Sequence, residues 1–277
     1  MSNRALAVIT GASSGIGAEF ARQLAKRGFD LLLIARRQDR LQALADELAQ
    51  TCNARSEILV ADLATDDDRE RATARILAAD NLAVLVNNAG FGTQGAFSEA
   101  DLTSQGQMHR LHILATLDLT HAALRTFKRQ GESTSTARGI ISVSSVAAFE
   151  QAPFNVSYCA TKAWMNSFMK GLSMELAAAG SAVRVQALCP GFTYSEFHDV
   201  LKMDRRAIPK SFWLPAAFVV SESLRGFDRN SLLVIPDWRY RWITRFIRMT
   251  PGPLMRSISI HYARKRRDRA RSLAAKT

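Results

Sequence analysis

Two side chains one helical turn apart could together transfer a proton at neutral pH. Tyr158 and Lys162 are four residues apart, a spacing that places both on one face of a helix. A free tyrosine has a pKa of about 10 and is a poor proton shuttle at pH 7. A lysine ammonium beside it favours the phenolate and is expected to lower that pKa. The pair is therefore a candidate general acid and base for an alcohol or ketone oxygen.

A serine thirteen residues before Tyr158 could hold the same substrate oxygen. This residue, Ser145, ends an apolar run, residues 139–145, that predicts a strand finishing in hydroxyl groups. Its hydroxyl is able to hydrogen-bond the oxygen that receives the proton. A tyrosine and a lysine at this spacing also occur on many solvated helices, so the interpretation depends on the elements around them.

A glycine-rich turn near the N-terminus supports the interpretation. An apolar run, residues 5–10, predicts a strand, and a helical pattern follows over residues 15–28. Between a strand and a helix, such a turn lets backbone N–H groups approach a pyrophosphate at the helix N-terminus. This order of elements favours nucleotide binding over an ordinary turn. The candidate cofactor-binding residues of the turn are Gly11, Ser13, Ser14, Gly15, Ile16 and Gly17.

Apolar runs and helical patterns alternate along most of the chain. The expected strands are residues 5–10, 31–36, 57–61, 83–87, 139–144, 183–188 and 232–235. The expected helices are residues 15–28, 39–50, 66–80, 101–130, 156–179 and 214–224. This alternation predicts an α/β fold with one doubly wound parallel sheet of about seven strands and helices on both faces.

Four motifs in this order resemble the classical short-chain dehydrogenase/reductase family over about residues 4–236. They are TGxxxGIG at residues 10–17, NNAG at residues 87–90, the trio Ser145, Tyr158 and Lys162, and Pro190-Gly191. The resemblance implies a single Rossmann-type domain, residues 1–237, that transfers hydride between a nicotinamide and a substrate carbon. It also implies that Ser145 orients the substrate oxygen and that Lys162 binds the nicotinamide ribose. A homodimer or homotetramer is expected.

The expected cofactor is NADP(H). Arg36 and Arg37 end the second strand, at the place where NAD sites carry a carboxylate for the ribose 2′-hydroxyl and NADP sites an arginine for the 2′-phosphate. The alternative is a solvated basic pair at a strand end. The resemblance places Asp62 and Leu63 against the adenine, although Asp62 could also be a helix cap. The remaining cofactor residues that the resemblance implies are Asn88, Ala89, Gly90, Pro190, Gly191, and Thr193 or Ser195 at the nicotinamide amide.

One position departs from the family pattern. The family carries an asparagine before the fifth strand, which helps to hold a water that connects the lysine to solvent. His112 falls at that position in this chain. A histidine could replace those polar contacts or relay protons itself, since its pKa is near neutral. It could equally be a partly buried helix residue with a backbone partner, so the catalytic role of His112 stays open.

Composition narrows the class of protein. A length of 277 residues with 47% apolar residues suits one large α/β domain. No apolar run approaches the roughly 18 residues of a membrane span, and the N-terminus lacks a signal-peptide pattern. Three scattered cysteines and the lack of a metal motif favour a cytoplasmic protein with reduced thiols and no metal site. The net charge is +12, but residues 1–238 carry only about +1, so no nucleic-acid partner is expected.

Residues 192–213 are expected to cover the substrate, as this region does in the family. Large apolar side chains there suit a hydrophobic carbonyl or alcohol, although core packing accounts for part of them. These side chains are Tyr194, Phe197, Leu201, Met203, Ile208, Phe212 and Trp213.

Residues 238–277 are expected to form a basic amphipathic C-terminal extension. From Arg239 onward the chain has twelve Lys or Arg and one acid, Asp268, a charge of +11. A basic helix with apolar residues on one side could lie on an anionic membrane surface or pack on the domain or a sister subunit. On a helix over residues 238–249, the apolar side holds Trp238, Trp242, Ile243, Phe246, Ile247 and Met249, and the basic side Arg241, Arg245 and Arg248.

Together these features predict an NADP(H)-dependent oxidoreductase that interconverts a hydrophobic ketone and a secondary alcohol. Tyr158 would be the general acid in reduction and the general base in oxidation. The alternative is a dinucleotide-binding regulator or scaffold with weak turnover, because His112 could impair the proton relay.

Overall fold

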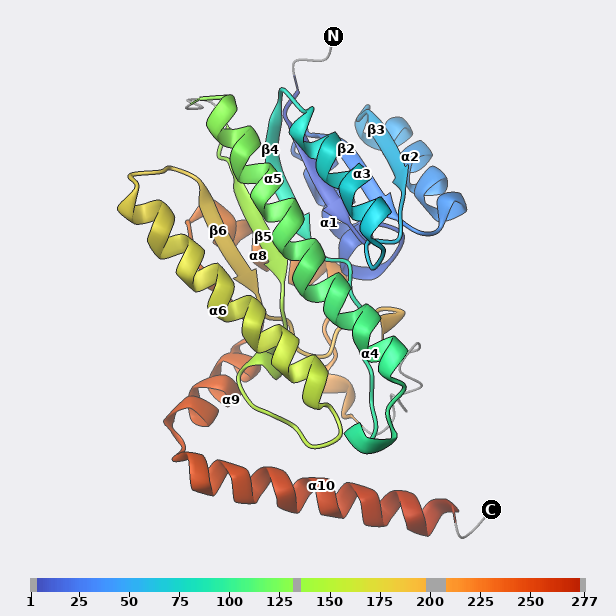
Figure 1. The fold of residues 1–277 in the computed structure, drawn as a ribbon, viewed down its shortest axis with the longest axis vertical. Helices are drawn as coiled ribbons and strands as arrows, with labels where there is room; N and C mark the ends of the chain where they lie inside the picture. Colours follow the sequence, from blue (N-terminus) through green and yellow to red (C-terminus); the bar gives the residue numbers. More distant parts are fainter. Residues whose placement is uncertain (1–3, 132–135, 198–207, 275–277) are drawn as a thin grey trace.

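A parallel sheet lies at the centre of the protein (Figure 1). The computed structural model describes residues 4–131, 136–197 and 208–274, with side chains up to residue 265, and over these residues it has one sheet of seven strands. The strand order is β3-β2-β1-β4-β5-β6-β7, with every neighbouring pair parallel. The strands are β1 (Leu6–Thr10), β2 (Asp30–Ala35), β3 (Ser56–Val60), β4 (Leu82–Asn87), β5 (Gly139–Val143), β6 (Arg184–Leu188) and β7 (Leu233–Val234). The predicted fold class is therefore confirmed.

Helices cover both faces of this sheet, and each face has its own apolar core. On one face Phe20, Leu41 and Val219 belong to the same buried cluster, contributed by α1 (Gly15–Lys26), α2 (Gln38–Cys52) and α8 (Ala216–Asp228). The other face is covered by α3 (Asp66–Leu77), α5 (Ala115–Arg129) and α6 (Val156–Ala178), which lie in front of the sheet in Figure 1. Burial on both faces explains why strands such as β2 are continuously apolar from Leu31 to Ile34.

The strand order places the sequence motifs at one edge of the sheet. The order reverses between β1 and β4, and in open α/β sheets a ligand binds at the carboxyl ends of the strands beside such a reversal. The glycine-rich turn follows β1, Asn88 follows β4, Ser145 follows β5 and Pro190 follows β6. Parallel strands therefore bring four distant segments to the same crevice.

The expected helix over residues 101–130 is interrupted. It consists of α4 (Leu102–His109), a π-helical turn (Arg110–Leu114) and α5, which together continue without a loop. A π turn adds a residue to the helical repeat, so it changes which side chains face the sheet, and such turns are frequent at functional sites. His112 lies in the middle of this turn and is fully buried. The 3.6-residue periodicity of this segment does not indicate the irregular turn.

Two helices follow β7. The predicted helix over residues 238–249 is α9 (Trp238–Met249), and α10 (Gly252–Ala274) follows it after Pro251. In Figure 1, α10 is a long helix that runs beneath the rest of the protein. In the parts of the chain that the structure describes, no helix combines the length and the apolar character that crossing a membrane requires.

Candidate active site

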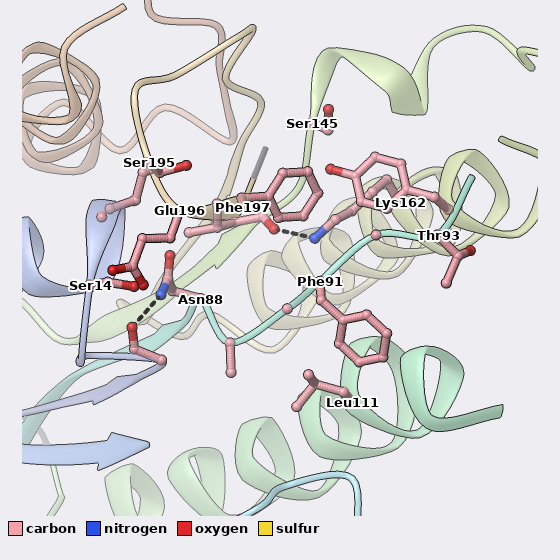
Figure 2. Close-up of a pocket in the computed structure, with 18 of the residues that line it drawn as sticks. Ser14, Asn88, Phe91, Thr93, Leu111, Ser145, Lys162, Ser195, Glu196 and Phe197 are labelled. Carbon is pink, nitrogen blue, oxygen red and sulfur yellow. Dashed lines mark hydrogen bonds between the residues drawn. The ribbon is translucent and has the colours of Figure 1, made fainter. Parts of the chain in front are cut away.

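The loops at the carboxyl edge of the sheet enclose a cleft of about 910 Å³. Figure 2 shows Ser145 and Lys162 towards one end of this cleft and Ser14 and Ser195 towards the other. Every site residue predicted from the sequence lines the cleft, except Gly17 and His112, which lie directly behind its wall. The structure therefore brings the predicted cofactor and catalytic residues into one continuous space.

Tyr158 and Lys162 lie on the same face of α6, and both reach the cleft. The Lys162 side chain is buried, and its Nζ lies 5.7 Å from the centre of the Tyr158 ring. Nζ donates a hydrogen bond of 2.8 Å to the carbonyl oxygen of Val143, the last residue of β5 (Figure 2). This bond fixes the ammonium group between α6 and β5.

The pKa values of this pair differ from the expectation. Burial raises the pKa of Tyr158 to about 12, although the side chain of Ser145 acts in the opposite direction. Burial also lowers the pKa of Lys162 to about 8. The prediction that Lys162 lowers the pKa of Tyr158 is wrong for this structure, because the loss of water around the phenol outweighs any attraction from the ammonium group. Tyr158 is therefore protonated at neutral pH.

Ser145 stands at the end of β5, where the chain turns into a short 3₁₀ helix. Its hydroxyl oxygen accepts a hydrogen bond of 3.1 Å from the backbone N–H of Ala147. The preceding Ser144 points the other way, is buried, and donates to the carbonyl oxygen of Lys162 over 3.0 Å. Of the two serines, Ser144 therefore binds α6 to the sheet, whereas Ser145 lines the cleft together with Tyr158.

His112 is fully buried against the catalytic helix. Its Nδ1 lies 2.9 Å from Oγ1 of Thr161, and that hydroxyl donates to the carbonyl oxygen of Tyr158 over 2.9 Å. A threonine hydroxyl has one proton, so Nδ1 carries the hydrogen of the first bond and Nε2 is an acceptor. The His112 and Tyr158 rings meet edge to face at 5.9 Å. His112 thereby supports the turn of α6 that carries Tyr158.

The other nitrogen of His112 is the unusual feature. Nε2 is buried and has no hydrogen-bond partner among the described residues. It lies so close to Gly90 that a Cβ there would stand 2.7 Å from it. Burial, together with the positive charge of Lys162, holds the pKa of His112 well below its usual range. The expectation of a near-neutral pKa is therefore wrong, and His112 is uncharged at pH 7.

The glycine-rich turn leaves open space at the N-terminus of α1. Gly11 and Gly15 have φ angles of +66° and +55°, a region that favours glycine. A Cβ on Gly17 would lie 2.3 Å from the carbonyl oxygen of Gly11. Asn88 donates from its side chain to the carbonyl oxygen of Thr10 over 2.8 Å and to that of Gly11 over 3.3 Å, and so holds the turn against β4. This cradle fits the pyrophosphate of a dinucleotide.

Arg37 lies over the glycine-rich turn and is held by three side chains. It donates to the hydroxyls of Ser13 and Ser14 over 3.0 Å and to a carboxylate oxygen of Glu196 over 2.8 Å. Glu196 also accepts from Arg40, and these two bonds hold its pKa below the usual value. Glu196 was missed in the sequence because it is 159 residues from Arg37.

Arg36 and Asp62 mark the outer end of the cleft. The Arg36 guanidinium is largely exposed and lies 3.7 Å from the Asp62 carboxylate. Asp62 also accepts a hydrogen bond of 3.1 Å from the backbone N–H of Ala64. It therefore stabilises the turn before α3 as well as facing the cleft, while the N-cap position of that helix belongs to Thr65.

The segment after β6 covers the glycine-rich turn. The Thr193 hydroxyl donates to the carbonyl oxygen of Gly191 over 3.0 Å, so it is engaged with the backbone. Ser195 lies directly over Gly15, where a Cβ would come within 2.9 Å of the serine Cβ. Of the two candidates for the nicotinamide amide, Ser195 is thus the one that packs on the turn.

Apolar side chains line the catalytic end of the cleft. The ring of Phe197 lies 5.6 Å from that of Tyr158, and Phe91 and Leu111 contribute from the opposite side (Figure 2). Tyr194 is different, because it stacks on Trp213 at 5.2 Å, and Trp213 is itself buried. Leu201 and Met203 lie outside the described residues. The sequence pattern missed Phe91 and Leu111, since neither lies in the expected covering segment.

Comparisons with known proteins agree with this geometry. The family model of the short chain dehydrogenases matches residues 5–206. The oxidoreductase YmfI of Bacillus subtilis, itself described as uncharacterized, is 32% identical over 245 residues, which cover 84% of this chain and 98% of YmfI.

Two solved structures are similar in both sequence and fold. A short-chain dehydrogenase from Sphingobium yanoikuyae in complex with NADPH is 33% identical, with a TM-score of 0.78 over 86% of this chain and 91% of that one. An alcohol dehydrogenase from Comamonas testosteroni, specific for bulky-bulky ketones, is 29% identical, with a TM-score of 0.74 over 91% of this chain and 96% of that one.

Proposed function

The chain belongs to the short chain dehydrogenase family of oxidoreductases, and we propose that it is an NADP(H)-dependent enzyme that interconverts a hydrophobic ketone and a secondary alcohol. One observation carries the proposal. A half-buried, protonated phenol, Tyr158, shares a single cleft with the glycine cradle that fits a dinucleotide. A proton donor and a hydride carrier in one cleft are what carbonyl reduction requires.

The side chains have separate tasks in this reaction. The nicotinamide, when bound, supplies or accepts the hydride. Ser145 holds the substrate oxygen by a hydrogen bond, and Tyr158 gives its proton to that oxygen in reduction and takes it back in oxidation. Lys162 binds the nicotinamide ribose, and its ammonium group stabilises the phenolate that forms when the proton leaves. His112 keeps the turn of α6 around Tyr158 in place through Thr161.

Arg36 and Arg37 favour NADP(H) over NAD(H). The positions that directly follow β2 carry arginines and no Asp or Glu that could bind a ribose 2′-hydroxyl, and the Arg37 guanidinium lies beside the hydroxyls of Ser13 and Ser14. A guanidinium flanked by hydroxyls suits a phosphate, since it can offer parallel N–H donors. The similar dehydrogenase from Sphingobium yanoikuyae was solved with NADPH, which supports this choice.

The lining of the catalytic end supports a bulky apolar substrate. Phe91, Leu111 and Phe197 face the space beside Tyr158, where polar and charged substrates would lose hydration without compensation. The ketone specificity of the similar Comamonas testosteroni enzyme agrees with this class.

A direct assay tests the proposal. Purified protein should oxidise NADPH in the presence of apolar ketones with bulky groups on both sides of the carbonyl, measured by the loss of NADPH absorbance. Tyr158→Phe keeps the ring but removes the proton, so turnover should fall by about 10²-fold or more while NADPH still binds. Near-normal turnover in this variant would sink the mechanism.

The same assay separates the alternative function. NADPH binding by the wild-type chain without turnover on any ketone or alcohol of the panel would favour a dinucleotide-binding regulator or scaffold.

Three further features are also part of the proposal. Residues 1–237 would be the dinucleotide-binding and catalytic domain, and residues 238–277 its extension. The protein would be a cytoplasmic homodimer or homotetramer, which light scattering on the purified chain can measure.

A further inference from the structure

We propose that the outer face of α9 docks this protein on an anionic lipid surface. Four large apolar side chains form a stripe along this helix, and each is more than 60% exposed: Trp238 at 65%, Trp242 at 65%, Phe246 at 63% and Met249 at 73%. Successive residues of a helix are about 100° apart, so the four lie within one narrow sector that runs along its full length of about 18 Å. This stripe, here called the tryptophan stripe, is a continuous exposed apolar surface.

The orientation of α9 is fixed by its opposite face. Tyr240 is 3% exposed, and its hydroxyl accepts from the backbone N–H of Phe192 over 3.0 Å and donates to the carbonyl oxygen of Phe212 over 2.7 Å. Thr244, one turn later, is 2% exposed. Because these residues hold the helix against the segment that covers the cleft, the tryptophan stripe points away from the domain. Of the alternatives that the sequence left open, packing of the apolar side on the domain is therefore excluded for these four residues.

The positive charge beside the tryptophan stripe favours an anionic binding partner. From Trp238 to Arg267 the chain has nine Lys or Arg and no Asp or Glu. Arg245 and Arg248 lie along one edge of the stripe in the helical repeat, and the Arg245 guanidinium lies 6.0 Å from the Trp242 ring. The exposed Arg256, Arg264 and Lys265 of α10 add to the same positive field. A helix of this kind lies in the lipid interface, with its apolar side chains inserted and its cations at the phosphates.

A second copy of this chain fits the surface less well. A two-fold interface would put the same stripe on both sides, so the arginines of one subunit would meet those of its partner. Since the segment from Trp238 to Arg267 offers no acidic residue to pair with them, the contact would bring like charges together. An anionic lipid surface satisfies both the apolar stripe and the cations beside it.

Vesicle flotation of the full chain tests this proposal. The protein should float with vesicles of phosphatidylcholine and phosphatidylserine at low salt, and much less with phosphatidylcholine alone or at high salt. Tryptophan emission should shift to the blue on binding, because Trp238 and Trp242 leave water. A failure to float with the anionic vesicles at low salt would overturn the proposal.

Matched variants locate the contact. Trp242→Ser with Phe246→Ser should lower vesicle partitioning by about tenfold or more, since binding scales with buried apolar area. Arg245→Gln with Arg248→Gln should lower binding to anionic vesicles specifically. Met174→Ser, which removes a side chain of equal exposure from α6, should bind as the wild type does. Thermal unfolding confirms that each variant is folded.

Two other outcomes would also overturn the proposal. One is that the Trp242→Ser and Phe246→Ser variant floats as well as the wild type. The other is that neither chain floats and this variant elutes as a smaller oligomer, which would make the tryptophan stripe a subunit interface. The test is independent of turnover, so it stands even if the proposed reaction fails.

Discussion

Among the individual residues, Arg36 and Arg37 are predicted to set the preference for NADPH over NADH. Replacing Arg36 and Arg37 with glutamine removes both guanidinium groups that can reach a 2′-phosphate. The preference for NADPH over NADH should shrink by ~1.5 kcal/mol or more, the low end for a hydrogen bond to a charged group. Fluorescence titration with both cofactors measures the ratio, and an unchanged ratio would contradict the assignment.

A substitution at Glu196 is expected to have the opposite effect on NADPH binding. Its carboxylate occupies Arg37 and Arg40, so a 2′-phosphate at Arg37 has to compete with it. Glu196→Gln should therefore tighten NADPH binding about two- to fivefold, the range of a solvent-exposed charge interaction, and leave NADH binding nearly unchanged. Equal effects on the two cofactors would show that Glu196 acts on the covering segment instead of the phosphate.

His112 should make the stability of the protein depend on pH. Its pKa is lowered in the folded state, so below about pH 6.5 the unfolded chain binds a proton that the folded chain excludes. The free energy of unfolding should fall on acidification by up to about 1.4 kcal/mol per pH unit from this residue.

Urea unfolding at pH 7.5 and pH 5.5 measures the effect. His112→Gln should reduce the loss of stability between the two pH values, whereas His121→Gln, at an exposed position on α5, should not. The histidine contribution is absent if wild type and His112→Gln lose the same stability.

Among the secondary-structure elements, α9 supports the segment after β6. Its Tyr240 joins the loop after β6 to Phe212, and a Cβ on Gly191 would lie 2.0 Å from the Tyr240 ring. The glycine of the Pro190-Gly191 motif is thus required by a helix that lies beyond the catalytic motifs. Through this contact α9 supports the segment that covers the glycine-rich turn.

Removing one hydroxyl tests that support. Tyr240→Phe removes the hydroxyl that bonds the N–H of Phe192 and the carbonyl of Phe212, so the free energy of unfolding should fall by about 1–3 kcal/mol. Urea denaturation measures the change. Tyr262→Phe, at a position 63% exposed on α10, is the control and should have little effect. Equal losses in the two variants would show that the Tyr240 bonds do not stabilise the fold.

For the protein as a whole, two truncated chains test where the catalytic domain ends. A chain cut after Thr250 loses α10 and keeps Tyr240, so turnover and cofactor binding should persist. A chain cut after Asp237 also loses the buried Tyr240 ring, so its free energy of unfolding should fall by about 3 kcal/mol or more, as for removal of a buried aromatic side chain. Thermal and urea unfolding compare the two. If both are as stable as the full chain, the boundary belongs at residue 237.

The sequence by itself determined the fold class and most positions of the cleft. Apolar runs alternating with helical patterns predict a covered parallel sheet, because strand and helix periods are local properties. Parallel strands share one carboxyl edge, so the motifs after β1, β4, β5 and β6 had to meet there. The same periodicity predicted α9 and the separation of its apolar and basic sides.

Only the tertiary structure decided the state of those residues. Burial sets the pKa of Tyr158 and keeps His112 neutral, and the π turn that positions His112 has no periodic signature. Arg37 and Glu196 are in contact although 159 residues separate them in the sequence. The side of α9 that packs against the domain is the one that carries Tyr240, and the tryptophans lie on the exposed side. A local pattern shows that a helix has an apolar side. Which side meets the core depends on long-range packing, because it is the neighbouring segments that exclude water.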